Sequence, residues 1–210
     1  MEAMTIATMI RRRVDRAPAG SFLHVSDFTA LPRDAVDSAF SRLARSRGDF
    51  VRLRNGIYWK GVKSRFGAGR PDPVEAALAV AGRGAGPAGL SAANALGLTT
   101  QVAARPTVAV LGRCPTGIAD VHFVSRSNPG RRSLRGLEIA LLEVLREFPL
   151  HVEGDWDDLV RRVADLASDD RLRIGAVARV GLLEHSPAVR DRVATLRAAL
   201  AARGRRRRRS

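Results

Sequence analysis

The sequence has a single cysteine, almost no lysine and no long apolar run. One cysteine excludes an internal disulfide, so a reducing cytoplasm is the expected compartment. No apolar run approaches the roughly 20 residues of a membrane span, and no membrane partner is expected. A signal peptide is not expected either, because the basic residues Arg11–Arg13 follow the first apolar stretch instead of preceding it. The 210 residues are enough for one compact domain or two small ones.

Acidic residues are scarce at both ends of the chain. The net charge is +8 over residues 1–70, +1 over residues 71–202 and +6 over residues 203–210, which gives +15 in total. Apart from Lys60 and Lys63 every basic residue is arginine, which is typical of a GC-rich genome. That bias does not explain why acids balance arginine only in the middle. Clustered positive charge is typical of a protein that binds a polyanion.

The first sixty residues predict three helices followed by a hairpin. A helix is expected over Thr5–Arg16, a brief one from Phe28 to about Leu31, and a longer one over residues 33–47 with apolar residues in a single stripe. The Asn55-Gly56 pair between two short β-branched and aromatic runs predicts a two-residue hairpin turn. This order of elements predicts a winged helix-turn-helix whose third helix enters the major groove of DNA.

The third helix carries the first group of candidate DNA contacts. Serine and arginine lie on or beside the face opposite its apolar stripe, and both residue types can bind base edges or phosphates. Asp34 and Asp37 on the same helix repel phosphate, and either could orient an arginine or accept from cytosine. The candidates on this helix are Arg33, Ser38, Ser41, Arg42 and Arg45.

The hairpin carries the second group: Arg52, Arg54 and Asn55. A two-residue turn pairs Arg54 with Ile57, Leu53 with Tyr58 and Arg52 with Trp59, and paired residues share a face. The expected core-facing residues are Val51, Leu53 and Tyr58, and the expected outward ones are Arg52, Arg54, Ile57 and Trp59. A slip of one residue in the register would invert this assignment. The alternative for the whole segment is a small helical domain with a solvated basic face.

The predicted fold class is α+β, with the winged helix-turn-helix over residues 1–62 and a linker over residues 63–73. A mixed α/β domain over 74–150, a helical region over 151–202 and a disordered arginine-rich tail over 203–210 follow. The expected strands are Thr107–Leu111 and Val121–Ser125. The expected helices are Val74–Ala81, Leu90–Leu96, Leu137–Phe148, Trp156–Ala167, Leu172–Leu183 and Pro187–Ala202.

No pattern predicts catalysis, a cofactor or a metal ion. The glycine-rich run 82–89 follows a helical segment and contains Pro87, whereas a dinucleotide loop follows a strand. The histidines and Cys114 are not spaced as metal ligands. Ser91 is interpreted as a helix cap, and Glu153, Asp155, Asp157 and Asp158 as carboxylates that favour the start of a helix. We therefore expect no enzyme activity.

Several segments resemble AbiEi-type antitoxins of type IV toxin–antitoxin systems. The resemblance lies in residues 35–43 and 51–58, in the Leu90–Leu98 helix and in the Leu137–Leu145 helix, and it covers roughly residues 5–148. It implies a winged helix that binds inverted operator repeats as two protomers or a homodimer and represses its own operon. It also implies that the following domain counteracts a nucleotidyltransferase-like toxin, without a stable complex. Typical members are longer than this chain.

Two other functions remain open from the sequence. The chain could be a stand-alone winged-helix transcriptional regulator whose middle domain dimerises or senses a ligand, with no toxin partner. It could also be a nucleic-acid enzyme that docks through its winged helix, which would require convergent carboxylates. The arginine tail has three interpretations: a nonspecific phosphate clamp, a contact for an acidic partner, or a solvated end with no role.

Overall fold

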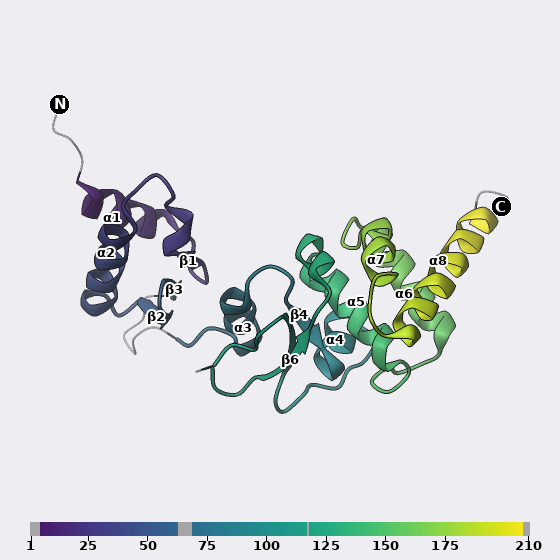
Figure 1. Cartoon of the computed structure of the whole chain (residues 1–210). Coiled ribbons are helices and arrows are strands. Elements are labelled where there is room, and N and C mark those ends of the chain that lie inside the picture. Colours follow the sequence, from purple (N-terminus) through teal and green to yellow (C-terminus); the bar gives the residue numbers. More distant parts are fainter. Residues whose placement is uncertain (1–4, 63–68, 117, 208–210) are drawn as a thin grey trace. The chain divides into compact units, whose positions relative to one another are not determined.

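The computed structural model describes residues 5–62, 69–116 and 118–207, and side chains only as far as Arg205 (Figure 1). The chain is a mixture of helices and two small sheets, which confirms the predicted α+β class. Its backbone contacts divide it into two compact units, Met1–Val80 and Ala81–Ser210. Most of the predicted linker, residues 63–68, lies outside the described residues. No helix of the described residues is both long and apolar enough to cross a membrane.

Unit 1 packs two helices and a three-stranded sheet around one core. Its elements are α1 (Ile6–Arg16), β1 (Phe22–His24), the 3-10 turn η1 (Val25–Asp27), α2 (Arg33–Ser46), β2 (Phe50–Arg54) and β3 (Ile57–Lys60), and α3 (Pro73–Ala81) follows at the boundary with unit 2. The core contains Ile10 and Val14 of α1 and a stack of three rings. The Tyr58 ring lies 5.0 Å from that of Phe40 and 5.2 Å from that of Phe50. These contacts hold α2 against the hairpin.

The brief helix expected from Phe28 to Leu31 is wrong. A single 3-10 turn forms earlier, over Val25–Asp27, because the Asp27 carboxylate accepts a hydrogen bond from the backbone N–H of His24 at 3.2 Å. The Asp27 carboxylate thus provides an acceptor for the backbone N–H at the start of the turn, and this contact sets where the turn begins. The chain then reaches α2 through Pro32 without a second α-helix.

The hairpin has the expected turn and a different register. The sheet order is β1-β3-β2, and Arg54 pairs with Ile57 as predicted. A bulge at Leu53 then moves every later pair by one residue, so Arg52 lies opposite Tyr58 and Val51 opposite Trp59. A bulge sets two residues of one strand against one of the other. Val51 is exposed and Trp59 is buried, the reverse of the prediction for each, while Tyr58 is buried as expected.

Unit 2 combines a second small sheet with a group of helices. Its elements are β4 (Gly86–Ala88), α4 (Gly89–Leu96), β5 (Thr107–Leu111), β6 (His122–Arg126), the 3-10 turn η2 (Pro129–Ser133), α5 (Gly136–Glu147), α6 (Trp156–Ser168), α7 (Ile174–Gly181) and α8 (Pro187–Arg207). The order is β4-β5-β6, with β4 antiparallel and β6 parallel to β5. The two predicted strands and the helices after them form within a few residues of their expected bounds. Strand β4 was not expected, since it lies within the predicted glycine-rich loop.

Helix α5 runs through the centre of unit 2. It contacts β4 and α4 on one side and α7 and α8 on another, and Glu138–Leu145 are all buried (Figure 1). One apolar core joins α4, α5 and the three later helices, so the regions predicted as 74–150 and 151–202 share a core. Gly86 lies against α5: a Cβ atom there would stand 2.6 Å from Cβ of Ile139. The glycine therefore permits close packing of β4 on α5.

Helix α8 extends further than the sequence predicted. It continues to Arg207, so residues 203–207 are helical where a disordered tail was expected. Residues 208–210 of that predicted tail lie outside the described residues. Alanine and arginine both favour helix, and arginines at a helix C-terminus interact well with the helix dipole, which explains the extension.

Candidate nucleic-acid interface

Helix α2 is flanked by two grooves, one against α1 and one against the hairpin. The first is lined by Thr8 and Arg11 of α1 and by Arg42 and Ser46 of α2. Arg11 and Arg42 are both exposed, so this groove presents two guanidinium groups and two hydroxyls. The sequence prediction left out Arg11. Its place on the polar face of α1, one residue after the buried Ile10, is the signal that could have identified it.

The second groove lies between the C-terminal half of α2 and β2. Ser41, Arg45, Arg47 and Arg52 all contribute to its lining. Arg52 donates a hydrogen bond to the Asn55 side-chain oxygen at 2.8 Å, and its guanidinium lies 5.9 Å from the centre of the Tyr58 ring. The structure therefore brings together Arg45 and Arg52, two of the predicted contacts, on either side of one groove.

Ser41 is turned toward the hairpin. Its hydroxyl shares a hydrogen bond with the Tyr58 hydroxyl at 3.1 Å, and its backbone carbonyl accepts from Nε of Arg45 at 3.3 Å. Ser41 therefore fixes α2 against the hairpin and orients Arg45. Its place in the structure is better explained by these contacts than by base recognition.

The other predicted contacts are exposed but line neither groove. Arg33 and Ser38 lie on the outer face of α2, and Arg54 lies beside Asn55 at the hairpin turn. Asp34 is exposed on the same helix and Asp37 is half-buried, so two acids remain next to this surface. The exposed surface of unit 1 thus carries arginines from α1, α2 and the hairpin.

Arg47 neutralises two carboxylates at the far end of α2. It forms an ion pair with Asp15 of α1 and another with Asp49 at 2.8 Å, just before β2. The hydrogen bonds from Arg47 lower the pKa of the Asp49 carboxyl below its usual range. These acids are therefore internally compensated, and Arg47 is occupied in holding α1, α2 and β2 together.

The carboxylates and the serine weighed at the sequence level in unit 2 have structural partners. Asp155 caps α6, its Oδ1 accepting from the backbone N–H of Asp158 at 3.0 Å. Glu153 accepts a hydrogen bond from the Thr99 hydroxyl at 2.7 Å. The helix-cap interpretation of Ser91 is wrong: α4 begins at Gly89, and the Ser91 hydroxyl accepts from the backbone N–H of Thr107 at 3.1 Å. Within the described ranges, no three metal-ligating side chains gather as an ion site would require.

Unit 2 also contains a buried ionic network that the sequence analysis missed. Arg131 of η2 is fully buried, with Nη1 2.7 Å from Oε1 of Glu143 and Nε 2.8 Å from Oε1 of Glu184. Arg126 and Arg146 reach the same two carboxylates from the surface. Burial raises the pKa of Glu184, but the hydrogen bond and charge of Arg131 outweigh it and hold that pKa below its ordinary value. The sequence signal was a pair of glutamates in apolar surroundings, Glu143 within the apolar stretch Ile139–Leu145 and Glu184 directly after Leu182 and Leu183.

The comparisons with known proteins assign no function to this surface. A family model described as a family of unknown function (DUF6088) matches residues 9–112. The crystal structure of the RV2827C protein from Mycobacterium tuberculosis is similar at 21% identity over 96% of this chain and 83% of that chain, with a TM-score of 0.43. No curated protein matches the chain in sequence.

Proposed function

We propose that unit 1 is a winged helix-turn-helix that binds double-stranded DNA, and that the protein is an antitoxin that represses its own operon. In this proposal α2 enters the major groove, and the hairpin contacts the neighbouring backbone or minor groove. Unit 2 then counteracts a nucleotidyltransferase-like toxin. The DNA-binding part is supported by geometry and charge, whereas the antitoxin part is supported by the family resemblance.

One observation carries the DNA-binding proposal: exposed arginines of α2 and the hairpin flank a single groove. Arg45 and Arg52 line it from opposite sides, and Arg42 faces the neighbouring groove with Arg11. Guanidinium groups bind phosphate and guanine through paired donors, and a helix beside a hairpin is the arrangement that winged helices use on DNA. The ring stack of Phe40, Phe50 and Tyr58 keeps the two elements in place.

The two acidic residues on α2 favour DNA binding that is selective for sequence. Asp34 and Asp37 repel phosphate, so a purely nonspecific interaction with the backbone is weaker than the arginine count alone indicates. A carboxylate in the major groove accepts a hydrogen bond from cytosine N4. We therefore expect binding that depends on sequence as well as on charge.

The experiment is a fluorescence anisotropy titration with the DNA immediately upstream of the protein's own gene. Scrambled DNA of the same length and composition is the competitor, and each titration is run at 50 mM and 200 mM salt. Preferential binding to the upstream DNA that survives competition at the higher salt supports repression of its own operon. Equal binding to both DNAs that collapses at 200 mM salt contradicts it.

The antitoxin part has a separate test. The neighbouring gene is expressed from an inducible promoter in cells with and without this protein. Growth arrest that the full chain relieves supports the antitoxin, and a variant with Arg52→Ala and Arg54→Ala should relieve it as well, because the proposal assigns toxin neutralisation to unit 2. If the neighbouring gene encodes no toxin while the upstream DNA is bound, the stand-alone regulator becomes the better description.

A further inference from the structure

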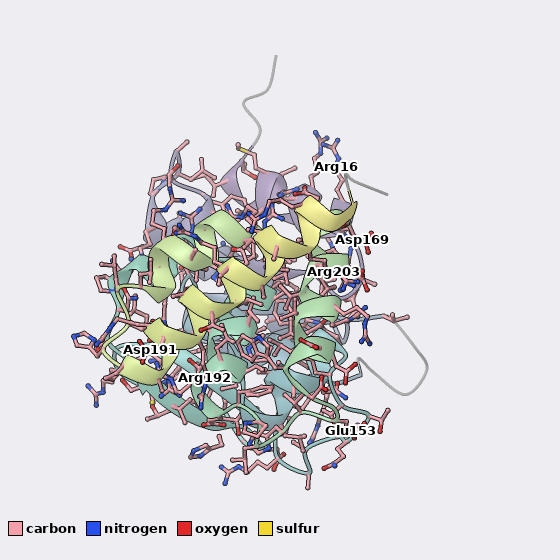
Figure 2. All side chains as sticks on the ribbon, turned by 90° about the vertical axis from the view of Figure 1, so that its right-hand side faces the viewer. Arg16, Glu153, Asp169, Asp191, Arg192 and Arg203 are labelled. Atoms are coloured by element: carbon pink, nitrogen blue, oxygen red, sulfur yellow. The ribbon has the colours of Figure 1, made fainter. Side chains whose placement is uncertain are left out.

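The C-terminal end of α8 is the second basic region of the molecule. From Arg197 to Arg209 the sequence contains seven arginines and no acidic residue. Figure 2 looks onto this helix, with Asp191 and Arg192 near its start and Arg203 near its other end. The arginines at the start are occupied: Arg190 donates to the carbonyl of Glu184, and Arg192 to that of Leu145. Arg197, Arg203 and Arg205, further along the helix, are exposed.

Two of the exposed arginines share one face of the helix. Arg197, Ala201 and Arg205 are four residues apart, and four-residue steps stay on nearly the same face. Arg197 and Arg205 line a groove together with Leu182, Ala194, Ala198 and Ala201. At 1.5 Å per residue their positions are about 12 Å apart along the axis. Small alanine side chains between them allow an extended backbone to approach the helix closely.

The exposed arginines of α8 have no carboxylate partner within the part of the chain that the structure describes. Arg197, Arg203 and Arg205 form no ion pair with any carboxylate of the described residues. Like charges at this density destabilise a helix in water. A bound polyanion removes that repulsion.

We infer that the C-terminal end of α8 is a phosphate-binding element that contacts nucleic acid without reading its sequence. The 12 Å between Arg197 and Arg205 spans three to four phosphates of a strand, at about 3.4 Å each. The hot spots of protein interfaces combine arginine with tryptophan and tyrosine anchors. Residues 201–210 offer only alanine, glycine, serine and arginine, and such a surface suits phosphate.

This element is distinct from the interface proposed in unit 1 and does not depend on that interface being sequence-specific. The two differ in what they do to binding. Contacts in unit 1 should change the preference for one DNA over another. Contacts of α8 should change the affinity for all DNAs equally, because phosphates carry no sequence information.

The test compares full-length variants in which Arg197 and Arg205 are changed together, first to glutamine and then to lysine. Each is titrated with scrambled and upstream duplexes at several salt concentrations. Each phosphate contact contributes about 0.9 to the slope of log K against log salt, so the glutamine variant should lose about 1.8 on both DNAs. The lysine variant keeps the charge and should retain the slope, and circular dichroism checks that helix content is unchanged.

A variant with Arg42→Ala and Arg45→Ala, both on the helix that the proposed function places in the major groove, separates this inference from the proposed function. It should lose preference for the upstream DNA and keep the slope contributed by α8. If the wild-type protein shows no preference for upstream DNA, the proposed function fails, while a lower slope in the glutamine variant still supports the α8 element. If the glutamine variant binds scrambled DNA with unchanged affinity and slope, the inference is wrong.

Discussion

Arginine has two roles in this chain: buried arginines form internal ion pairs, and exposed arginines can bind external anions. Arg131 is completely buried against Glu143 and Glu184, and it fixes η2 to α5 and to the end of α7. Arg54 at the hairpin turn is exposed and is available to an external anion. Removing a buried charge leaves its partner uncompensated in a poorly solvated site, whereas removing an exposed one changes only what the surface attracts.

Arg54→Ala should weaken binding to the upstream DNA and flatten its salt dependence by about one unit, if Arg54 contacts a phosphate. Anisotropy titrations at several salt concentrations measure both quantities. Arg171→Ala is the matched control, because Arg171 is an exposed arginine of unit 2. Unchanged affinity and slope in Arg54→Ala would remove the hairpin turn from the interface.

Glu184→Gln should destabilise unit 2 by about 3 kcal/mol at pH 7, because it removes one of the two carboxylates that compensate the buried Arg131 and the nearer carboxylate partner of Arg146. Urea unfolding in a Trp59→Phe background measures this, since Trp156 then reports on unit 2 alone. Glu147→Gln is the control, since that half-exposed carboxylate faces only His151 at 3.4 Å. A Glu184→Gln variant as stable as this control would contradict a structural role for the network.

The same network predicts how unit 2 responds to acid. The pKa of Glu184 is lowered in the folded state, so its stabilising contribution is complete above the ordinary glutamate pKa of about 4.3. That contribution is lost as the pH falls through the lowered pKa, because the folded state must then take up a proton. The free energy of unfolding should therefore fall on acidification, and it should fall less in Glu184→Gln. Equal pH dependence in both proteins would contradict this.

At the scale of elements, single residues decide how strands meet helices. The bulge at Leu53 turns Arg52 onto the face of Tyr58 and places it in the groove beside α2. In unit 2, β4 packs on α5 only because Gly86 has no side chain. The bulge departs from the regular pairing that the turn predicts, and the contact of Gly86 with Ile139 joins segments far apart in sequence, so neither follows from local pattern.

Gly86→Ala should destabilise unit 2 by about 1–3 kcal/mol, because the new Cβ would stand 2.6 Å from that of Ile139 and force β4 away from α5. Gly175→Ala provides the contrast: Gly175 lies in α7, has open space around it, and alanine favours helix by up to about 1 kcal/mol. Thermal or urea unfolding of both variants measures the difference. Equal stability of the two variants would mean that β4 can shift without cost.

At the scale of the whole molecule, positive charge is concentrated in two segments of the sequence. Residues 1–70 and the end of α8 are strongly basic, and the segment between them is close to neutral. If the protein contacts six or more phosphates, its affinity for scrambled DNA should fall about a thousandfold or more between 50 and 200 mM salt. A neutral solute at matched osmolarity should have little effect, and an equal loss of affinity in it would contradict an electrostatic cause.

The sequence by itself determined the α+β class, the position of most helices, the Asn55-Gly56 turn and the charge distribution, because these depend on local periodicity, turn chemistry and composition. The Leu53 bulge, strand β4, the contact of Ser41 with Tyr58 and the ionic network around Arg131 emerged only in the folded chain. The last three require groups that are distant in sequence to meet, and the bulge breaks the regular pairing that the turn predicts. The same holds for the groove that places Arg45 beside Arg52, on which the proposed DNA interface rests.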